Sequence, residues 1–167
     1  WYCEYGQVQF AASGLVKSEN DAFDGWYYVR NGCVQKGQET VVQNSSGWWY
    51  IGTDGKVDFH KNTVAPNEYG WWAVRNGAVD FQLNGIASNE SGDWYCRGGQ
   101  VDFGAAGVLE SETEGFCGWY YIQNGCVQKG QETVKQNSNG WWYIGTDGKV
   151  DFGFSGIASN ENGTWYI

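Results

Sequence analysis

The chain has 167 residues, and its 18% aromatic and 17% charged residues, with 26 Gly, are typical of many short strands joined by tight turns rather than of helices. The net charge of −9 argues against nucleic acid or an anionic membrane surface as partner, because both require clustered Lys and Arg. No apolar run reaches the roughly 18 residues that a membrane-spanning helix needs.

Aromatic openings recur along the chain every 22 to 26 residues, and each predicts a strand. In chain order they begin at Trp1, Trp26, Trp48, Trp71, Asp93, Trp119, Trp141 and Thr164. A turn signal and a second short apolar run follow each opening, as in Asn76-Gly77 followed by Val79-Asp80-Phe81. The predicted repeat is therefore strand, turn, strand and loop.

These repeats predict a single array, 1–167, of about seven hairpins. Their approximate bounds are 1–25, 26–47, 48–70, 71–92, 93–118, 119–140 and 141–163, with an eighth hairpin starting at 164. A shift of 93 residues superimposes 26–59 on 119–152 with four differences, which are Val29/Ile122, Arg30/Gln123, Val42/Lys135 and Ser46/Asn139. Such near-identity indicates a superrepeat, 1–93 and 94–167, made by duplication of a unit that stacks on its own kind.

Turn signals predict the register of the hairpins. Asn-Gly pairs favour two-residue type I′ turns, because both central positions need positive φ, and they occur at Asn31-Gly32, Asn76-Gly77 and Asn124-Gly125. In the fourth hairpin this pairs Arg75 with Ala78, Val74 with Val79, Ala73 with Asp80 and Trp72 with Phe81. The three-residue loops Thr53-Asp54-Gly55 and Thr146-Asp147-Gly148 preserve that register and pair Ile51 with Val57 and Trp49 with Phe59.

The two faces of each hairpin receive different predictions. The face of Trp49, Ile51, Val57 and Phe59 is assigned to the core, since residues two apart share a face. The opposite face carries a second aromatic set, whose rings either pack against the next hairpin, as unstable isolated hairpins require, or line clefts where packed edges meet. The candidate ligand-binding aromatic residues on it are Trp26, Tyr28, Trp48, Tyr50, Trp71, Trp119, Tyr121, Trp141 and Tyr143, and the candidate polar partners are Asp58, Asp80, Asp102 and Asp151.

The segment from Trp141 to Val150 resembles the core of choline-binding and glucan-binding repeats in surface proteins of Gram-positive Firmicutes. A closer resemblance, to cell-wall-binding-like repeats, lies in 140–152 followed by 156–163, and it extends over essentially the whole chain. It implies an all-β fold of tandem β-hairpin repeats stacked as a β-solenoid, with choline held between hairpins by cation–π attraction to Trp and Tyr rings. Val-Asp-Phe stands here in place of the TGW segment of that family, and a sugar stacked on the rings is the other ligand compatible with this set.

The predicted function is a non-catalytic cell-wall or glycan-binding module that anchors a secreted protein at the bacterial cell surface. The carboxylates recur at repeat spacing, which favours scaffold or multivalent binding over an enzyme, and no cofactor is expected. The expected partners are cell-wall polymer, choline or glycan, bound through weak sites that gain avidity in an array. The alternative is a structural stalk or spacer, or a host-protein adhesin, without a small ligand. The lack of Met predicts that this sequence is cut from a longer secreted or surface protein.

Five cysteines add a redox hypothesis. The shift of 93 residues maps Cys3 onto Cys96 and Cys33 onto Cys126, which predicts the disulfides Cys3–Cys33 and Cys96–Cys126; free thiols in small core positions are the alternative. Cys117 is left over, and we expect it, or the end hairpins, to offer a route to self-association. The lone His60 is predicted to be a surface residue, and no metal site is expected.

Overall fold

The computed structural model describes residues 1–167 and is nearly all β. Its twenty short strands pair with antiparallel partners, and its one helical element is a short 3₁₀ turn, η1 (Asp21–Phe23). None of its helices has the length and apolarity needed to cross a membrane. The chain divides into two compact units, Trp1–Phe81 and Gln82–Ile167, here called unit 1 and unit 2 and described separately.

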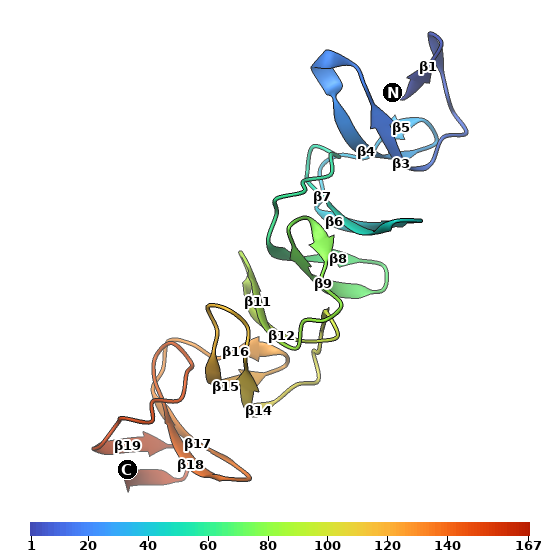
Figure 1. Cartoon of the computed structure of the whole chain (residues 1–167). Helices are drawn as coiled ribbons and strands as arrows, with labels where there is room; N and C mark the ends of the chain where they lie inside the picture. The colour runs from blue at the N-terminus through green and yellow to red at the C-terminus, as the bar shows by residue number, and fades with distance from the viewer. The chain divides into compact units, whose positions relative to one another are not determined.

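Unit 1 contains the blue to green part of the chain in Figure 1. Its strands are β1 (Cys3–Glu4), β2 (Gln7–Val8), β3 (Gly14–Ser18), β4 (Gly25–Arg30), β5 (Cys33–Val34), β6 (Thr40–Asn44), β7 (Gly47–Ile51), β8 (Thr63–Asn67), β9 (Gly70–Arg75) and β10 (Ala78–Val79). Three full hairpins, β3–β4, β6–β7 and β8–β9, make up most of it.

Unit 2 contains the remaining strands, toward the red end of the colour bar. They are β11 (Gly85–Asn89), β12 (Gly92–Arg97), β13 (Gln100–Val101), β14 (Gly107–Ser111), β15 (Gly118–Gln123), β16 (Cys126–Val127), β17 (Thr133–Asn137), β18 (Gly140–Ile144), β19 (Ile157–Asn160) and β20 (Gly163–Tyr166). Its four full hairpins are β11–β12, β14–β15, β17–β18 and β19–β20.

Each full hairpin contains a strand that the sequence prediction lacks. The aromatic strand β7 pairs with the segment before it, from Thr40 opposite Ile51 to Asn44 opposite Gly47. Our repeat of strand, turn, strand and loop placed a loop there, because Thr-Val-Val-Gln-Asn has no strict alternation of apolar and polar residues. The longest pairing in each repeat therefore joins the aromatic strand to the segment before it. The predicted second strand is a short addition on the other side of the aromatic strand.

The predicted register of that short addition is confirmed for the residues next to the turn. Arg75 pairs with Ala78 and Val74 with Val79, and the Asp80 amide donates to the Ala73 carbonyl at 3.0 Å. Asn76 has φ 50° and Gly77 has φ 74°, as a type I′ turn requires. In the third hairpin Ile51 pairs with Val57 across its longer loop.

Consecutive hairpins stack within each unit. Their first strands lie side by side, β3 by β6 and β6 by β8 in unit 1, and β11, β14, β17 and β19 in succession in unit 2. The short strand that follows one hairpin also pairs with the aromatic strand of the previous hairpin. Ala78 of β10 lies opposite Trp49 of β7 in unit 1, and Cys126 of β16 lies opposite Trp94 of β12 in unit 2. The expected all-β stack of hairpin repeats, a solenoid-like architecture, is confirmed.

The core lies between hairpins and uses both faces of each. Tyr50, opposite Val41 on its own hairpin, packs against Val74 and Val79 of the next one and is 3% exposed. The aliphatic part of the predicted core face is buried, with Ile51 at 1% exposure. Burial of a Tyr with two or three aliphatic side chains stabilises each interface by several kcal/mol, at about 1.5–3 kcal/mol per side chain.

The phenylalanines of the predicted core face are not core residues. Phe59 lies beyond the short strand, is 43% exposed, and meets the Trp49 ring edge-on at a centroid separation of 5.4 Å. The other exposed members of this set are Phe81, Phe103 and Phe152. Their assignment to the core was wrong, because the pairing that would carry the ring inward ends at Val57.

Candidate functional site

An asparagine fixes the tryptophan at the second position of five of the eight openings. Asn67 Oδ1 accepts hydrogen bonds from Trp72 Nε1 and from the Tyr69 amide, both at 2.9 Å, so one oxygen closes the turn and orients the indole. The same bond recurs at Asn44–Trp49, Asn89–Trp94, Asn137–Trp142 and Asn160–Trp165. Sequence reasoning missed these asparagines, although their constant five-residue spacing from the tryptophan was a usable signal.

Four aromatic rings from two consecutive hairpins gather in unit 1. Trp48 of β7 lies 5.1 Å from Trp72, 5.8 Å from Phe81 and 6.0 Å from Tyr69, between ring centroids. Tyr69 is 65% exposed. We call Trp48, Tyr69, Trp72 and Phe81 the unit 1 tryptophan edge. Because its rings touch one another, a bound group would lie on their exposed faces rather than between them.

Unit 2 repeats the central pair of this edge. Trp141 and Trp165 correspond to Trp48 and Trp72 by the 93-residue shift, and their rings stack at 5.8 Å with an interplanar angle of 22°. They are 46% and 42% exposed, and Asn162 stands at the position of Tyr69. We call this pair the unit 2 tryptophan edge.

Tyrosine rings elsewhere hold cations of the chain itself. Six of the ten Lys and Arg residues lie over a tyrosine ring within the range of cation–π attraction. The pairs are Arg30–Tyr28, Lys56–Tyr27, Lys61–Tyr50, Arg97–Tyr95, Lys135–Tyr121 and Lys149–Tyr120. A ligand cation would compete with these side chains for the same ring faces.

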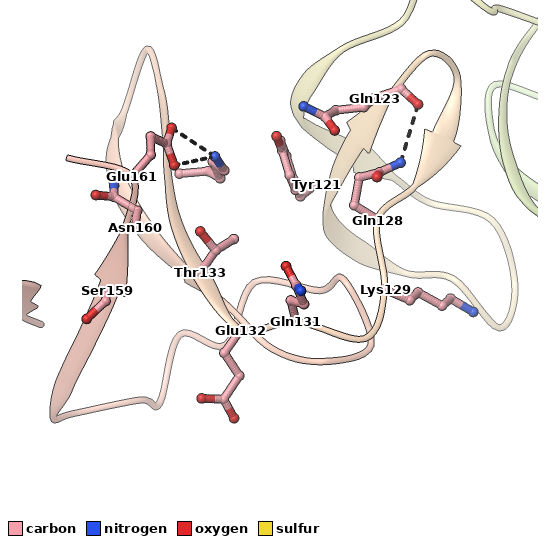
Figure 2. A pocket seen from close by; sticks show the side chains of 11 residues that line it. Tyr121, Gln123, Gln128, Lys129, Gln131, Glu132, Thr133, Ser159, Asn160 and Glu161 are labelled. Atoms are coloured by element: carbon pink, nitrogen blue, oxygen red, sulfur yellow. Dashed lines mark hydrogen bonds and ion pairs between the residues drawn. The ribbon is translucent and has the colours of Figure 1, made fainter. Parts of the chain in front are cut away.

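Tyr121 of β15 lines a cavity of about 490 Å³, shown in Figure 2. The Lys135 ammonium lies 5.1 Å from its ring centroid and 3.0 Å from both carboxylate oxygens of Glu161. The hydrogen bond to Glu161 is the main cause that raises the pKa of Lys135. A hydrogen bond from its own backbone, and then the one from Lys135, lower the pKa of Glu161. Ring, ammonium and carboxylate thus form one connected group.

Tyr50 and Tyr143 are buried in the stack. Tyr50 borders a cavity of about 560 Å³, where Lys61 lies 5.5 Å from its ring centroid and 3.9 Å from Glu39. Burial, followed by a hydrogen bond to Glu39, raises the pKa of the Tyr50 hydroxyl far above its usual value. Tyr143 stacks instead on Phe154, with centroids 3.7 Å apart. Both tyrosines serve packing at these positions.

The other predicted aromatic residues are spread over separate places. Trp26 is 36% exposed, and Tyr28 is half-buried under Arg30. Trp71 is half-buried opposite Pro66, and Trp119 packs in the core between its hairpin and the next. Of the nine predicted rings, Trp48 and Trp141 are the two that join the tryptophan edges.

The predicted polar partners have turn and ion-pair contacts. Asp58 Oδ1 accepts from the amide of His60 at 2.9 Å, and His60 is exposed, as predicted. The same turn contact is made by Asp102 with Gly104 and by Asp151 with Gly153. Asp80 pairs with Arg75 at 3.3 Å and Asp102 with Arg97 at 2.9 Å. These contacts place the aspartates in the framework of their own hairpins.

The structure does not support the predicted disulfides, since all five cysteines are free thiols in it, Cys3 and Cys33 included. The register sets Cys126 opposite Trp94, two residues before Cys96, and such diagonal neighbours lie about 7–8 Å apart, beyond the usual reach of a disulfide. Cys96 is fully buried, and its burial raises the pKa of the thiol to about 12. Cys117 is exposed.

One protein family matches the sequence of this chain. A sequence model of the choline-binding repeat matches residues 23–35, 39–58, 61–80, 84–102, 118–128 and 153–167. No curated protein matches the chain.

Solved structures similar to this chain include three proteins from Streptococcus pneumoniae. Choline binding protein F is 19% identical over 93% of this chain and 48% of its own, with a TM-score of 0.39. The modular autolysin LytC is 12% identical over 93% of this chain and 37% of its own, with a TM-score of 0.38. The choline-binding domain of CbpL is 17% identical over 92% of this chain and 87% of its own, with a TM-score of 0.33. The chain spans about half the length of choline binding protein F.

Proposed function

Because the chain belongs to the choline-binding repeat family, whose sequence model matches more than half of its residues, we propose that it is a non-catalytic module that attaches a bacterial surface protein to the cell wall. Its ligand is choline, or another quaternary ammonium group, carried on a cell-wall polymer. The tryptophan edges are the proposed contact points.

The recurrence of the Trp48–Trp72 pair as Trp141–Trp165 carries this proposal. Both pairs lie where two hairpins meet, and each indole of the second partner is oriented by an asparagine, Asn67 or Asn160. A quaternary ammonium is attracted to exposed indole faces by about 0.5–2 kcal/mol per contact. The net charge of −9 adds a long-range attraction for cations.

Single sites of this kind are weak, and the array compensates for it. A polymer with many choline groups presents a high local concentration once one site is filled, so avidity exceeds the affinity of any single edge. We therefore expect millimolar binding of free choline, near the 4 kcal/mol that corresponds to 1 mM, and much tighter retention on choline-bearing cell wall.

A structural spacer is the second candidate. It is favoured by the burial of Tyr50 and Tyr143, at 3% and 7% exposure, and by the six tyrosine faces that hold the chain's own cations. In that case the tryptophan edges only join hairpins, and no ammonium ligand binds to them.

Calorimetric titration with choline, together with co-sedimentation on choline-bearing cell walls, separates the two candidates. We expect the native chain to bind in both assays, and W48L/W141L to lose most of the heat and of the sedimented protein. W26L is the matched control, because Trp26 is exposed but belongs to neither edge. A native chain that gives no heat and does not sediment is the spacer.

A further inference from the structure

The two copies of the repeat keep a cation over the same tyrosine but take it from different residues. Arg30 lies 5.6 Å from the Tyr28 centroid; its counterpart in the second copy, Gln123, carries no charge. There Lys135, which replaces Val42, lies 5.1 Å from the Tyr121 centroid. Two of the four differences between 26–59 and 119–152 thus remove the cation at one position and supply it from another.

The cation of the second copy is held much more firmly than that of the first. Arg30 is exposed, whereas the side chain of Lys135 is 21% exposed and contacts both carboxylate oxygens of Glu161 at 3.0 Å. Glu161 comes from the next hairpin, 26 residues along the chain. Glu68 stands at the equivalent position in the first copy, with Val42 in place of the lysine.

The space beside Lys135 suits a small polar cation. Figure 2 shows the Tyr121 ring and the Glu161 carboxylate facing the same space, with Thr133 between their strands. An aromatic face with a nearby carboxylate is the chemistry that binds quaternary ammonium groups. The cavity of about 490 Å³ lies within the range of small-molecule sites, about 300–1,000 Å³.

We propose that the face of Tyr121 is an ammonium-binding site that the side chain of Lys135 itself fills. Because Lys135 occupies this site, no soluble ammonium ligand binds there. The proposal rests on the proposed function, because it assigns the ligand preference of one further ring in the same array. It means that the number of choline sites is smaller than the number of aromatic repeats, and that a single residue switches one site off.

A simple salt bridge between hairpins would look similar, and its consequences differ. A pair with one exposed partner, as Glu161 is here at 64% exposure, contributes little to stability, and its removal would only loosen the contact of β17 with β19. If Lys135 occupies a ligand site, its removal instead creates binding of choline at Tyr121. The decisive readout is therefore gain of binding at a defined place.

The test is an NMR titration of the ¹⁵N-labelled chain with choline chloride, comparing the native chain with K135V. Val is the residue of the first copy at this position, so the substitution suits the fold. In K135V we expect shifts of the Tyr121 and Thr133 amides that saturate with an affinity about tenfold higher than any response of these amides in the native chain. K135T is the second opening variant, used if K135V does not fold.

Two controls test whether the gain of choline binding depends on the Tyr121 ring and on the space that the Lys135 side chain leaves. K135M keeps the length of the side chain without its charge, and we expect it to block the site and bind no choline there. K135V/Y121L removes the ring and is expected to lose the gain.

The outcomes separate this proposal from the proposed function. If Trp48 and Trp141 respond to choline but Tyr121 stays silent in K135V and K135T, Lys135 is only a salt-bridge residue and the inference is overturned. If the tryptophan edges stay silent while K135V responds at Tyr121, the proposed function fails at its own sites and the inference stands. Silence at all three places overturns both.

Discussion

Hairpins β6–β7 and β17–β18 have nearly the same sequence but different surroundings. Their buried tyrosines, Tyr50 and Tyr143, are covered by Lys61 in the first case and by Phe154 in the second. These two residues are equivalent by the 93-residue shift but lie just beyond the near-identical segment. The environment of a repeat is therefore set by the residues that follow it, and similar hairpins acquire different properties.

The tryptophan edges differ in the same way. Trp48 is surrounded by three rings of the following hairpin, including Tyr69, whereas Trp141 stacks on Trp165 and Asn162 replaces the tyrosine. The unit 1 edge thus has more aromatic packing, and the unit 2 edge has more exposed indole surface. A ring can stabilise the stack or contact a ligand, and the residues of the next hairpin determine how much of the ring is packed and how much stays exposed.

The largest expected effect comes from disrupting the contact between the hairpin of Tyr50 and the next hairpin, in unit 1 only. The Tyr50 amide donates to the Gly77 carbonyl at 2.8 Å, and a Cβ on Gly77 would overlap the backbone of Asp58 and Phe59. With φ at 74° there is also strain for any L side chain. We expect G77A to lower the free energy of unfolding of unit 1 by about 3–5 kcal/mol, measured by urea denaturation and amide exchange.

The control for this substitution is G6A. Gly6 has φ 77° but open space around its Cβ position, so only about 1 kcal/mol is expected there. Exchange at the Tyr143 amide should not change in G77A. An equal loss in G6A and G77A would show that the turn conformation, rather than the contact between hairpins, is responsible.

An exchange of the two covering residues should have opposite effects in the two copies. F154K removes a stacked ring from Tyr143, and we expect a loss of about 2 kcal/mol, from the lost stacking and apolar burial. K61F places a phenyl group beside Tyr50, where the cavity has room for it, and is expected to stabilise unit 1 by about 1 kcal/mol. Thermal denaturation of both variants checks the signs. A loss of stability in both would mean that each copy is packed specifically for its own residue.

The smallest expected effect concerns pH. The backbone hydrogen bond of Glu161, and then its pairing with Lys135, lower its folded-state pKa from 4.5, so these contacts stabilise the fold above that value and are lost as the pH falls through the lower, folded-state pKa. The pKa of Lys135 is raised from 10.5, so its contribution is present below 10.5 and is lost as the pH rises through the raised pKa. E161Q should therefore have a slightly lower Tm than the native chain at neutral pH, and the difference should vanish in acid. E68Q, the equivalent change in the first copy, where Val42 stands in place of the lysine, should show no such pH dependence.

Local rules explain what could be predicted of the fold. The Asn76-Gly77 turn predicted the pairing of Val74 with Val79, because a type I′ turn fixes the two residues on either side of it. The burial of Ile51 and Val57 followed from alternation along the strand. The strand Thr40–Asn44 escaped prediction because its pattern is weak and its pairing depends on an Asn turn that the sequence does not mark with the usual Asn-Gly signal.

The site was predicted only in part. The sequence placed Trp48 and Trp141 on the same candidate face as Tyr50 and Tyr143, and the structure separates the two kinds of ring. The tryptophans lie at a hairpin boundary, and the tyrosines are buried. The sequence also paired Cys96 with Cys126, where the register leaves them diagonal. These errors share one origin, since repeat spacing relates equivalent positions but contains no information on which positions meet.

The sequence by itself determined the repeat, its turns, its aliphatic core positions and its family, because these depend on residues within a few positions of one another. Only the tertiary structure decided which ring faces are covered, which cations lie over them and which thiols stay apart. Those contacts join hairpins: Asn67 reaches Val41, Asn160 reaches Val134 and Lys135 reaches Glu161, each across 26 residues. Such contacts depend on how one hairpin stacks on the next, which no local pattern of residues specifies.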